Sequence, residues 1–382
     1  MRPIEEIRDG YDADRPLPGI AYRDADVFAL ETRLLRDSWT SVACGQNVAK
    51  LGDLFPVRIA GQSLFVARDR DAEIRVFYNL CRHRGAPLVD APCRAPAGGI
   101  VCPYHAWRYE LDGRLLAAPH FHRDSSSGQP SIEERKGLGL LPVRTAVWRD
   151  IVFVNLSGKA PAFEDFIRPL DERLAHWPAE ELRPLSSDEY EIQANWKLAT
   201  ENFIDAYHLP VVHPQIGGGF SGILSVEDVE VSDEIVGFAM PQGYGEGSGQ
   251  VDSPLPRFSR LAADEQLRIE VFSIFPNTLM LVEPDNQQVI VLRPEGPALT
   301  RETFANYLVS DASQAEALAK DRQDVHREAI KINDQDAVLL ASLQQTRSMD
   351  VGGETQPTQA WDAANRRFQR LWSQKLLACL DP

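Results

Sequence analysis

The chain has 382 residues, of which 43% are hydrophobic and 25% charged, and its formal net charge is −16. This length allows two domains or one large one. The negative charge argues against nucleic acid and against an anionic membrane surface as partners, because both are bound by clustered Lys and Arg.

Two further features bear on the compartment. The sequence has no run of about 18 apolar residues that could span a bilayer, and its polar, acidic N-terminus shows no secretory signal. The five cysteines, an odd number, favour metal-binding or structural thiols over a disulfide framework. We therefore expect a cytoplasmic protein with no membrane segment.

The first part of the chain predicts one helix followed by short strands. Residues 24–38 carry apolar side chains at helical spacing. Residues 54–79 then alternate between apolar and polar, and Gly61-Gln62 suits a hairpin turn. Residues 147–156 close this strand-rich region, so that residues 40–156 are expected to form a small all-β domain inserted in the chain.

The remainder mixes strands and helices. Residues 313–332 and 334–346 predict helices, and the strand candidates lie at 187–194, 226–231, 235–240, 268–275, 278–283, 287–293 and 302–309. Strands beside late helices indicate an α+β fold, an antiparallel sheet packed on helices.

Two stretches rich in Gly and Pro, 215–225 and 241–257, predict mobile loops. The second contains Gly243-Tyr-Gly-Glu-Gly-Ser-Gly, but no helix follows, as a dinucleotide-binding loop would require. We interpret it as a lid over a site. We expect no bound NAD.

The first chemical motif pairs cysteine with histidine twice, as Cys81-x-His83 and Cys102-x-x-His105. Two such turns side by side would offer two thiolates and two imidazoles. That set can hold one zinc ion, or a [2Fe–2S] cluster with two Cys on one iron and two His on the other. Zinc fingers have one pair of cysteines and one pair of histidines, whereas each pair here contains one Cys and one His.

The second motif lies within residues 195–214. If the segment is helical up to His208, then Glu201, Asp205 and His208 share one face, and Pro210 ends the helix nearby. His213 would then lie on the following loop, free to fold back beside His208. Two imidazoles and one carboxylate form a facial triad that leaves positions on Fe(II) open for O2 and substrate.

These motifs resemble a known family. Asn79-Leu-Cys-Arg-His-Arg-Gly-Ala, Cys102-Pro-Tyr-His-Ala-Trp and the run from Asn195-Trp-Lys to His213 are similar to the Rieske and mononuclear-iron motifs of ring-hydroxylating oxygenase α subunits. The implied fold is an inserted all-β Rieske domain and a catalytic helix-grip domain. The expected segments are 1–39, the N-terminal helical part of the catalytic domain, 40–156, the Rieske domain, and 157–382, the mononuclear-iron domain.

The resemblance also implies roles for individual residues. The [2Fe–2S] ligands would be Cys81, His83, Cys102 and His105, and the iron ligands His208 and His213. The third iron ligand is expected at Asp336, with Asp334 as the alternative. Asn202 and Asp205 are implied as catalytic residues, with Asp205 bridging toward a Rieske histidine of a neighbouring subunit in a homotrimer.

The expected function is that of a terminal oxygenase. It would use O2 and electrons from an NAD(P)H-dependent reductase or ferredoxin to insert one oxygen atom into a C–H bond of a small organic substrate. Residues 277–310 are similar to the branch that includes choline- and betaine-oxidising members, so a quaternary ammonium substrate is one possibility. The aromatic residues that could surround it are Phe203, Phe220, Phe238, Tyr244, Phe272 and Phe275.

Several alternatives stay open at this point. They are cis-dihydroxylation of an aromatic ring, a Rieske electron carrier without oxygenase activity, and a structural zinc protein.

Overall fold

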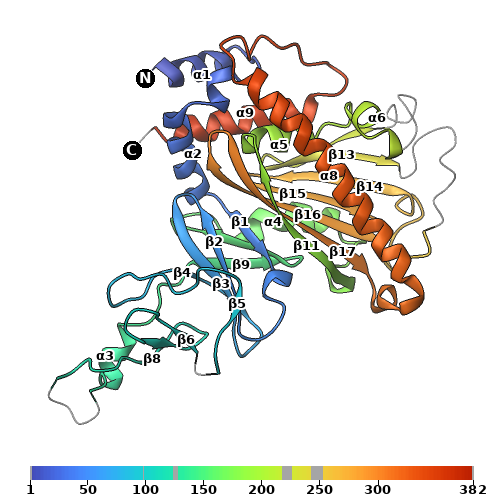
Figure 1. Cartoon of the computed structure of the whole chain (residues 1–382). Coiled ribbons are helices and arrows are strands. Elements are labelled where there is room, and N and C mark those ends of the chain that lie inside the picture. Colours follow the sequence, from blue (N-terminus) through green and yellow to red (C-terminus); the bar gives the residue numbers. More distant parts are fainter. Residues whose placement is uncertain (1, 98, 124–127, 217–225, 242–252, 381–382) are drawn as a thin grey trace. The chain divides into compact units, whose positions relative to one another are not determined.

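The computed structural model describes residues 2–97, 99–123, 128–216, 226–241 and 253–380 (Figure 1). The chain divides into two compact units, one formed by Ser41–Ala160 and the other by Met1–Thr40 together with Pro161–Pro382. No helix in these ranges has the length and apolar character needed to cross a membrane.

The Ser41–Ala160 unit is built from small antiparallel sheets. Their strand orders are β4-β3-β2-β5, β1-β10-β9 and β6-β7-β8. The strands are β1 Thr40–Cys44, β2 Asp53–Ile59, β3 Gln62–Arg68, β4 Ile74–Tyr78, β5 Cys93–Arg94, β6 Ile100–Val101, β7 Arg108–Tyr109, β8 Leu115–Ala117, β9 Arg144–Trp148 and β10 Ile151–Asn155, and the short helix α3 is Ile132–Lys136.

The hairpin between β2 and β3 corrects the predicted turn by one residue. Ile59 pairs with Gln62, so the connecting residues are Ala60 and Gly61. Both have positive φ, 49° and 71°. Positive φ at both central positions matches the right-handed twist of the strands that they join.

The second unit contains a seven-stranded antiparallel sheet in the order β11-β17-β16-β15-β14-β13-β12. Helix α8 runs across this sheet in Figure 1. The strands are β11 Leu182–Ile192, β12 Glu227–Ser232, β13 Ile235–Pro241, β14 Arg268–Ile274, β15 Thr278–Glu283, β16 Asn286–Gly296 and β17 Leu299–Val309. The helices are α1 Arg2–Asp12, α2 Ala25–Asp37, α4 Phe163–Arg173, α5 Trp196–Phe203, α6 Leu209–Val212, α8 Ala319–Arg347 and α9 Ala363–Ala378. The predicted α+β class is confirmed.

The largest apolar core of this unit joins α2, α5, α8 and α9 to the sheet. At its centre a buried ion pair links Lys197 of α5 to Glu31 of α2. The Lys197 ammonium also lies 4.7 Å from the ring centroid of Trp372, whose indole N–H donates to Glu31 at 2.8 Å. The polar contacts among Glu31, Lys197 and Trp372 therefore connect helices α2, α5 and α9 inside an apolar core.

Two predicted features of the helices were wrong. Residues 313–332 and 334–346 belong mainly to one continuous helix, α8, because Asn333 between them does not interrupt the helix. The segment leading to His208 is not one helix either, since α5 ends at Phe203 and α6 begins at Leu209. The two predicted mobile loops lie mostly outside the described residues.

Candidate metal centres

The chain between α5 and α6 presents the first histidine of the predicted iron site. Asn195 caps the start of helix α5, and its side chain accepts a hydrogen bond from the Lys197 amide at 3.0 Å. After Phe203 the chain leaves the helix, and the side chains of Ile204 and Ala206 enter two different apolar clusters. His208 then stands at the start of α6.

This break overturns the predicted shared helical face. Glu201 instead accepts hydrogen bonds from Tyr22 and Gln369 within the core. Pro210 does not end a helix but lies in the first turn of α6, where its missing N–H costs nothing. His213 immediately follows α6 and is buried.

The structure brings His208, His213 and Asp336 together. One possible ligand atom from each lies within 4.8 Å of the other two. The Asp336 carboxylate is 3.0 Å from Nε2 of His213 and 3.7 Å from Nε2 of His208. Two imidazoles and a carboxylate converging on one point are the ligand set of a non-heme Fe(II) site.

Three observations show that a metal ion fits here. Both ring nitrogens of His208 are buried without a hydrogen-bond partner in the described residues, which is costly unless something else binds them. Gln335 Oε1 lies 2.9 Å from Nδ1 of His213, so it can accept the Nδ1 proton and leave Nε2 to bind a metal. Burial alone would lower the pKa of His213, but the adjacent Asp336 carboxylate outweighs burial, so that the pKa is raised. The site therefore favours a positive charge.

Asp334 does not join this group. It lines a separate surface hollow with Arg327 and Lys331. Two residues correspond to about 200° around a helix, so Asp334 and Asp336 point in very different directions from α8. Of the two candidates for a third ligand, only Asp336 therefore lies beside both histidines.

The predicted catalytic residues lie beside His208. Asp205 Oδ2 is 3.5 Å from Nδ1 of His208, and Asp205 Oδ1 accepts a hydrogen bond from the Tyr207 amide at 2.7 Å. Asn202 is buried near the end of α5, and its carbonyl accepts from the Asp205 amide at 3.2 Å. Asp205 is thus within ion-pair distance of the His208 ring but makes no hydrogen bond to it.

The four predicted cluster ligands lie on two loops of the Ser41–Ala160 unit. Cys81 and Cys102 are buried, whereas His83 and His105 are exposed, with their Nδ1 atoms 3.1 Å apart. Each loop is closed by a backbone hydrogen bond, from Gly85 to Cys81 and from Ala106 to Cys102. The two residues that donate these bonds both have positive φ, 74° and 55°.

This donor set fits a [2Fe–2S] cluster with a buried thiolate end and an exposed imidazole end. The Cys81 sulfur lies 3.2 Å from the Tyr109 hydroxyl. Burial raises the pKa of the Cys81 thiol, and the neighbouring Cys102 adds to that effect. A bound cation would reverse it, because metal-bound thiols are deprotonated.

A cavity of about 430 Å³ opens beside the three mononuclear-site residues. The sheet contributes apolar side chains such as Phe238, Val271 and Phe304, and α8 contributes Ala329 and Ile332. Polar groups are fewer, and they include Glu283, Asn286, Gln288 and Glu328. A mostly apolar cavity with a few polar groups is typical of a small-molecule site.

The aromatic residues singled out from the sequence are divided by the structure. Phe203 and Phe238 line the cavity. Phe272 instead packs beneath the Arg173 guanidinium, and Phe275 belongs to the main core. Phe220 and Tyr244 lie outside the described residues.

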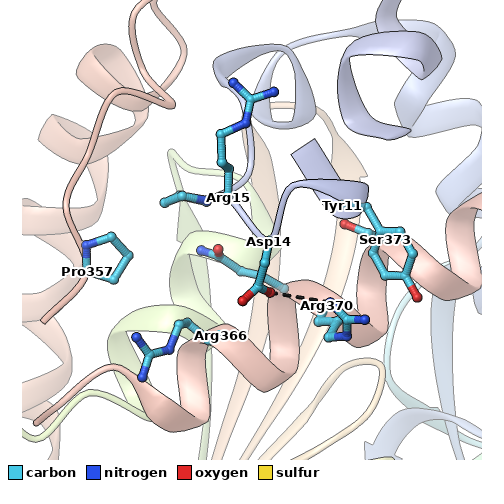
Figure 2. A pocket seen from close by; sticks show the side chains of 9 residues that line it. Tyr11, Asp14, Arg15, Pro357, Arg366, Arg370 and Ser373 are labelled. Atoms are coloured by element: carbon cyan, nitrogen blue, oxygen red, sulfur yellow. Dashed lines mark hydrogen bonds and ion pairs between the residues drawn. The ribbon is translucent and has the colours of Figure 1, made fainter. Parts of the chain in front are cut away.

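A second cavity, of about 30 Å³, lies between α1 and α9 (Figure 2). Figure 2 shows the Asp14–Arg370 ion pair across it, with Arg15 and Arg366 on its walls. It has room for about one water molecule and shares no lining residue with the larger cavity. The larger cavity is therefore the candidate substrate site.

Sequence reasoning missed three groups near these centres. Gln335 lies between the two aspartates already considered, and Tyr109 closely follows the second cysteine loop. Glu283 had a detectable signal, because it falls on the same side of the β15 strand pattern as Leu279 and Leu281. An acidic residue on an otherwise apolar strand face deserves a functional hypothesis.

The chain matches two known families of protein domain. Residues 38–163 match the Rieske [2Fe-2S] domain, and residues 179–378 match the catalytic domain of ring-hydroxylating alpha subunits. The chain belongs to the ring-hydroxylating alpha subunit family. This membership implies both a [2Fe–2S] cluster and a mononuclear iron.

Individual relatives of this alpha subunit include enzymes of quaternary ammonium metabolism. It is 35% identical over 205 residues to the glycine betaine monooxygenase oxygenase subunit of Chromohalobacter salexigens, covering 53% of this chain and 44% of that protein. It is 28% identical over 234 residues to the carnitine monooxygenase oxygenase subunit of Acinetobacter pittii, covering 59% and 60%. The match thus spans about half the length of these relatives.

Solved structures share the fold over nearly the whole chain. A quaternary ammonium Rieske monooxygenase superposes with a TM-score of 0.75 at 22% identity, covering 94% of this chain and 95% of that one. Naphthalene 1,2-dioxygenase from Rhodococcus superposes with a TM-score of 0.78 at 20% identity, covering 99% of both chains. At such identities these likenesses establish the architecture alone.

Proposed function

We propose that this chain is the terminal oxygenase component of a Rieske non-heme iron oxygenase, acting on a C–H bond of a small quaternary ammonium compound. The observation that carries the proposal is the convergence of His208, His213 and Asp336 at a mostly apolar cavity. The glycine betaine and carnitine monooxygenase relatives support the substrate class.

The proposal assigns the ligands as follows. Cys81, His83, Cys102 and His105 would hold the [2Fe–2S] cluster. His208, His213 and Asp336 would hold the iron and leave further positions open. When bound, the cluster supplies electrons one at a time, and the iron activates O2. The balanced reaction consumes one C–H bond, O2, two electrons and two protons, and yields an alcohol and water.

The chain's own residues prepare the site. Asp205 would orient the His208 ring through Nδ1, as carboxylates commonly do for metal-bound histidines. Gln335 would fix the proton of His213 on Nδ1 and leave Nε2 for the metal. The apolar walls of the cavity would exclude water and position the substrate.

Electron delivery is proposed to involve other proteins. The exposure of His83 and His105 supports electron transfer across the surface of the Rieske unit. We expect an NAD(P)H-dependent reductase or ferredoxin as donor. We also expect a homotrimer, in which Asp205 bridges toward a Rieske histidine of the next subunit, because a head-to-tail interface that closes produces a ring.

A single-turnover experiment tests this function. The metal-loaded protein is reduced with dithionite, the excess reductant is removed, and ¹⁸O₂ is added with a quaternary ammonium compound. We expect one ¹⁸O atom in the product, or formaldehyde and a tertiary amine if an N-methyl group is hydroxylated. His213→Ala should retain the reducible cluster and give no product.

Other outcomes would contradict the proposal and favour one of the alternative functions. A product carrying two ¹⁸O atoms as a cis-diol would indicate dihydroxylation of an aromatic ring instead. Reversible reduction without product from any substrate class would indicate an electron carrier. Absence of visible absorption in protein that binds zinc would indicate a structural zinc protein.

A further inference from the structure

A second buried carboxylate, that of Glu302, interacts with the charge of the candidate iron ligand Asp336. Glu302 belongs to β17 and is 3% exposed. Its Oε1 accepts a hydrogen bond from the side-chain amide of Asn333 at 2.8 Å. Asn333 precedes Asp336 by three residues on α8, and residues at that spacing lie on one face of a helix. The Asn333 amide therefore connects the sheet to the face of α8 that presents Asp336.

This hydrogen bond fixes the rotation of α8 next to the candidate iron ligands. Both of its side chains, Asn333 and Glu302, are buried, so that breaking the bond would leave two buried polar groups without a partner, which is unfavourable. The Asp336 carboxylate lies 3.0 Å from Nε2 of His213 and 3.7 Å from Nε2 of His208. A rotation of α8 would move the carboxylate away from both rings, and the bond to Glu302 resists that rotation.

The Glu302 carboxylate is unfavourable in the iron-free fold. Burial raises its pKa to about 7, and the charges of Asp336 and Glu189 add to the rise. The hydrogen bond from Asn333 and the charge of Arg293 oppose the rise without cancelling it. Above pH 7 the ionised form therefore reduces the stability of the fold, whereas a glutamine could accept the same hydrogen bond without a buried charge.

A metal ion would reverse this balance. A bound divalent cation is often the largest charge in its surroundings, and it favours the ionised form of carboxylates near it. An ion held by His208, His213 and Asp336 would also neutralise the Asp336 charge, which otherwise opposes ionisation of Glu302. Because coupling between two sites is reciprocal, an ion that stabilises the ionised Glu302 carboxylate is bound more tightly by the same factor.

We propose that Glu302 is a positioning residue for the mononuclear iron site. Through Asn333 it holds α8 in the rotation that brings Asp336 to the two histidines, and its negative charge strengthens binding of the divalent ion. The inference rests on the proposed function for the identity of the metal site. It adds a residue of the sheet to a site whose candidate ligands lie on α8 and at the two ends of α6.

Equilibrium binding of Fe(II) tests the inference without turnover. The mononuclear iron is removed by anaerobic chelation from protein that keeps its oxidised cluster, and Fe(II) is returned by equilibrium dialysis at pH 8. Nitric oxide is then added, because its Fe(II) adduct gives an EPR signal whose shape reports the ligand geometry, whereas the oxidised cluster is silent. The melting temperature of the iron-free protein is measured in parallel.

Two variants separate the charge from the hydrogen bond. Glu302→Gln keeps an acceptor for Asn333 and removes the charge, so it should weaken Fe(II) binding about tenfold with an unchanged EPR line shape. Asn333→Leu keeps the charge and removes the donor, so it should weaken Fe(II) binding and also alter the line shape. Iron-free Glu302→Gln should melt no lower than the wild type, whereas a merely structural role would lower stability and iron affinity together.

Asp334→Asn is the matched control. Asp334 follows Asn333 on α8 but is exposed, so removing its charge should change the Fe(II) affinity less than about twofold, because solvent and salt screen exposed charges. Unchanged Fe(II) binding by Glu302→Gln, or an equal loss in Asp334→Asn, would overturn the role of the charge. An unaltered EPR signal in Asn333→Leu would overturn the positioning of Asp336.

The two proposals fail separately. Oxygenation of a quaternary ammonium compound by Glu302→Gln protein with undiminished Fe(II) affinity would remove this inference and leave the proposed function standing. Wild-type protein that binds Fe(II) more tightly than Glu302→Gln but oxygenates no compound would do the reverse.

Discussion

Replacing Lys197 with Met should destabilise the unit that contains the sheet. Lys197 and Glu31 are fully buried and form an ion pair, and the second carboxylate oxygen of Glu31 has no hydrogen-bond partner in the described residues. Burial lowers the pKa of Lys197, and the Glu31 carboxylate opposes that effect. Removing the ammonium leaves a buried carboxylate without its counter-charge.

The expected loss of stability follows from the burial of this ion pair. Breaking a buried pair by removing one partner costs about 3–5 kcal/mol. In a protein of this size each kcal/mol shifts the melting temperature by about 2–4 °C. Lys197→Met should therefore have a melting temperature roughly 10 °C below that of the wild type, and a decrease between about 5 and 20 °C would agree with this reasoning.

The assay is thermal unfolding followed by circular dichroism at pH 7.5, on proteins with equal cluster content. A double variant, Lys197→Met with Glu31→Gln, serves as the matched control. It keeps an oxygen to accept from the Trp372 indole and removes the uncompensated charge, so it should recover much of the loss. A single variant within 2 °C of wild type (roughly half a kcal/mol), or a double variant no more stable than the single, would refute the reasoning.

Three other predictions concern the metal sites and a buried acid. His213→Ala should lose the mononuclear iron by metal analysis while Asp334→Ala keeps it, both with an unchanged cluster spectrum; iron loss in Asp334→Ala alone would contradict the ligand assignment. Cys81→Ala should lose the visible absorption of the cluster, and a retained spectrum would show that Cys81 is not a ligand. Burial raises the pKa of Glu302 from 4.5 to about 7, so its contribution to stability is present below about pH 4.5 and lost as the pH rises through 7. Glu302→Gln should therefore leave the melting temperature of iron-free protein unchanged at about pH 4.5. At pH 8 it should raise the melting temperature, because the free energy of unfolding increases by up to about 3 kcal/mol. A variant that melts below wild type at pH 8 would contradict this sign.

The cluster site could be predicted from sequence because its geometry is local. Each Cys–His pair spans only two or three residues, so a single tight turn brings both side chains together. The proposed third iron ligand is different, since Asp336 lies far along the chain from His213 and meets it only because α8 crosses the sheet. The sequence motif identified the acidic pair, but the choice between its members depends on the rotation of α8.

The local error near His208 has a physical cause. The spacing of Glu201, Asp205 and His208 is compatible with a helix, and no Gly or Pro precedes Pro210 to exclude one. The helix ends after Phe203, and in the irregular segment that follows Ile204 and Ala206 pack into separate apolar clusters. Tertiary packing decided the conformation, and the sequence window carries no sign of those clusters.

Helix α8 carries both a candidate iron ligand and a wall of the cavity, and this limits how the protein can be re-engineered. Gln335 and Asp336 contact opposite nitrogens of the His213 ring, while Ala329 and Ile332 of the same helix face the cavity. Larger side chains at those two positions would push α8 outward and loosen iron binding together with substrate fit. Phe238 and Val271 belong to the sheet, so specificity can be redesigned there with the least effect on the iron ligands.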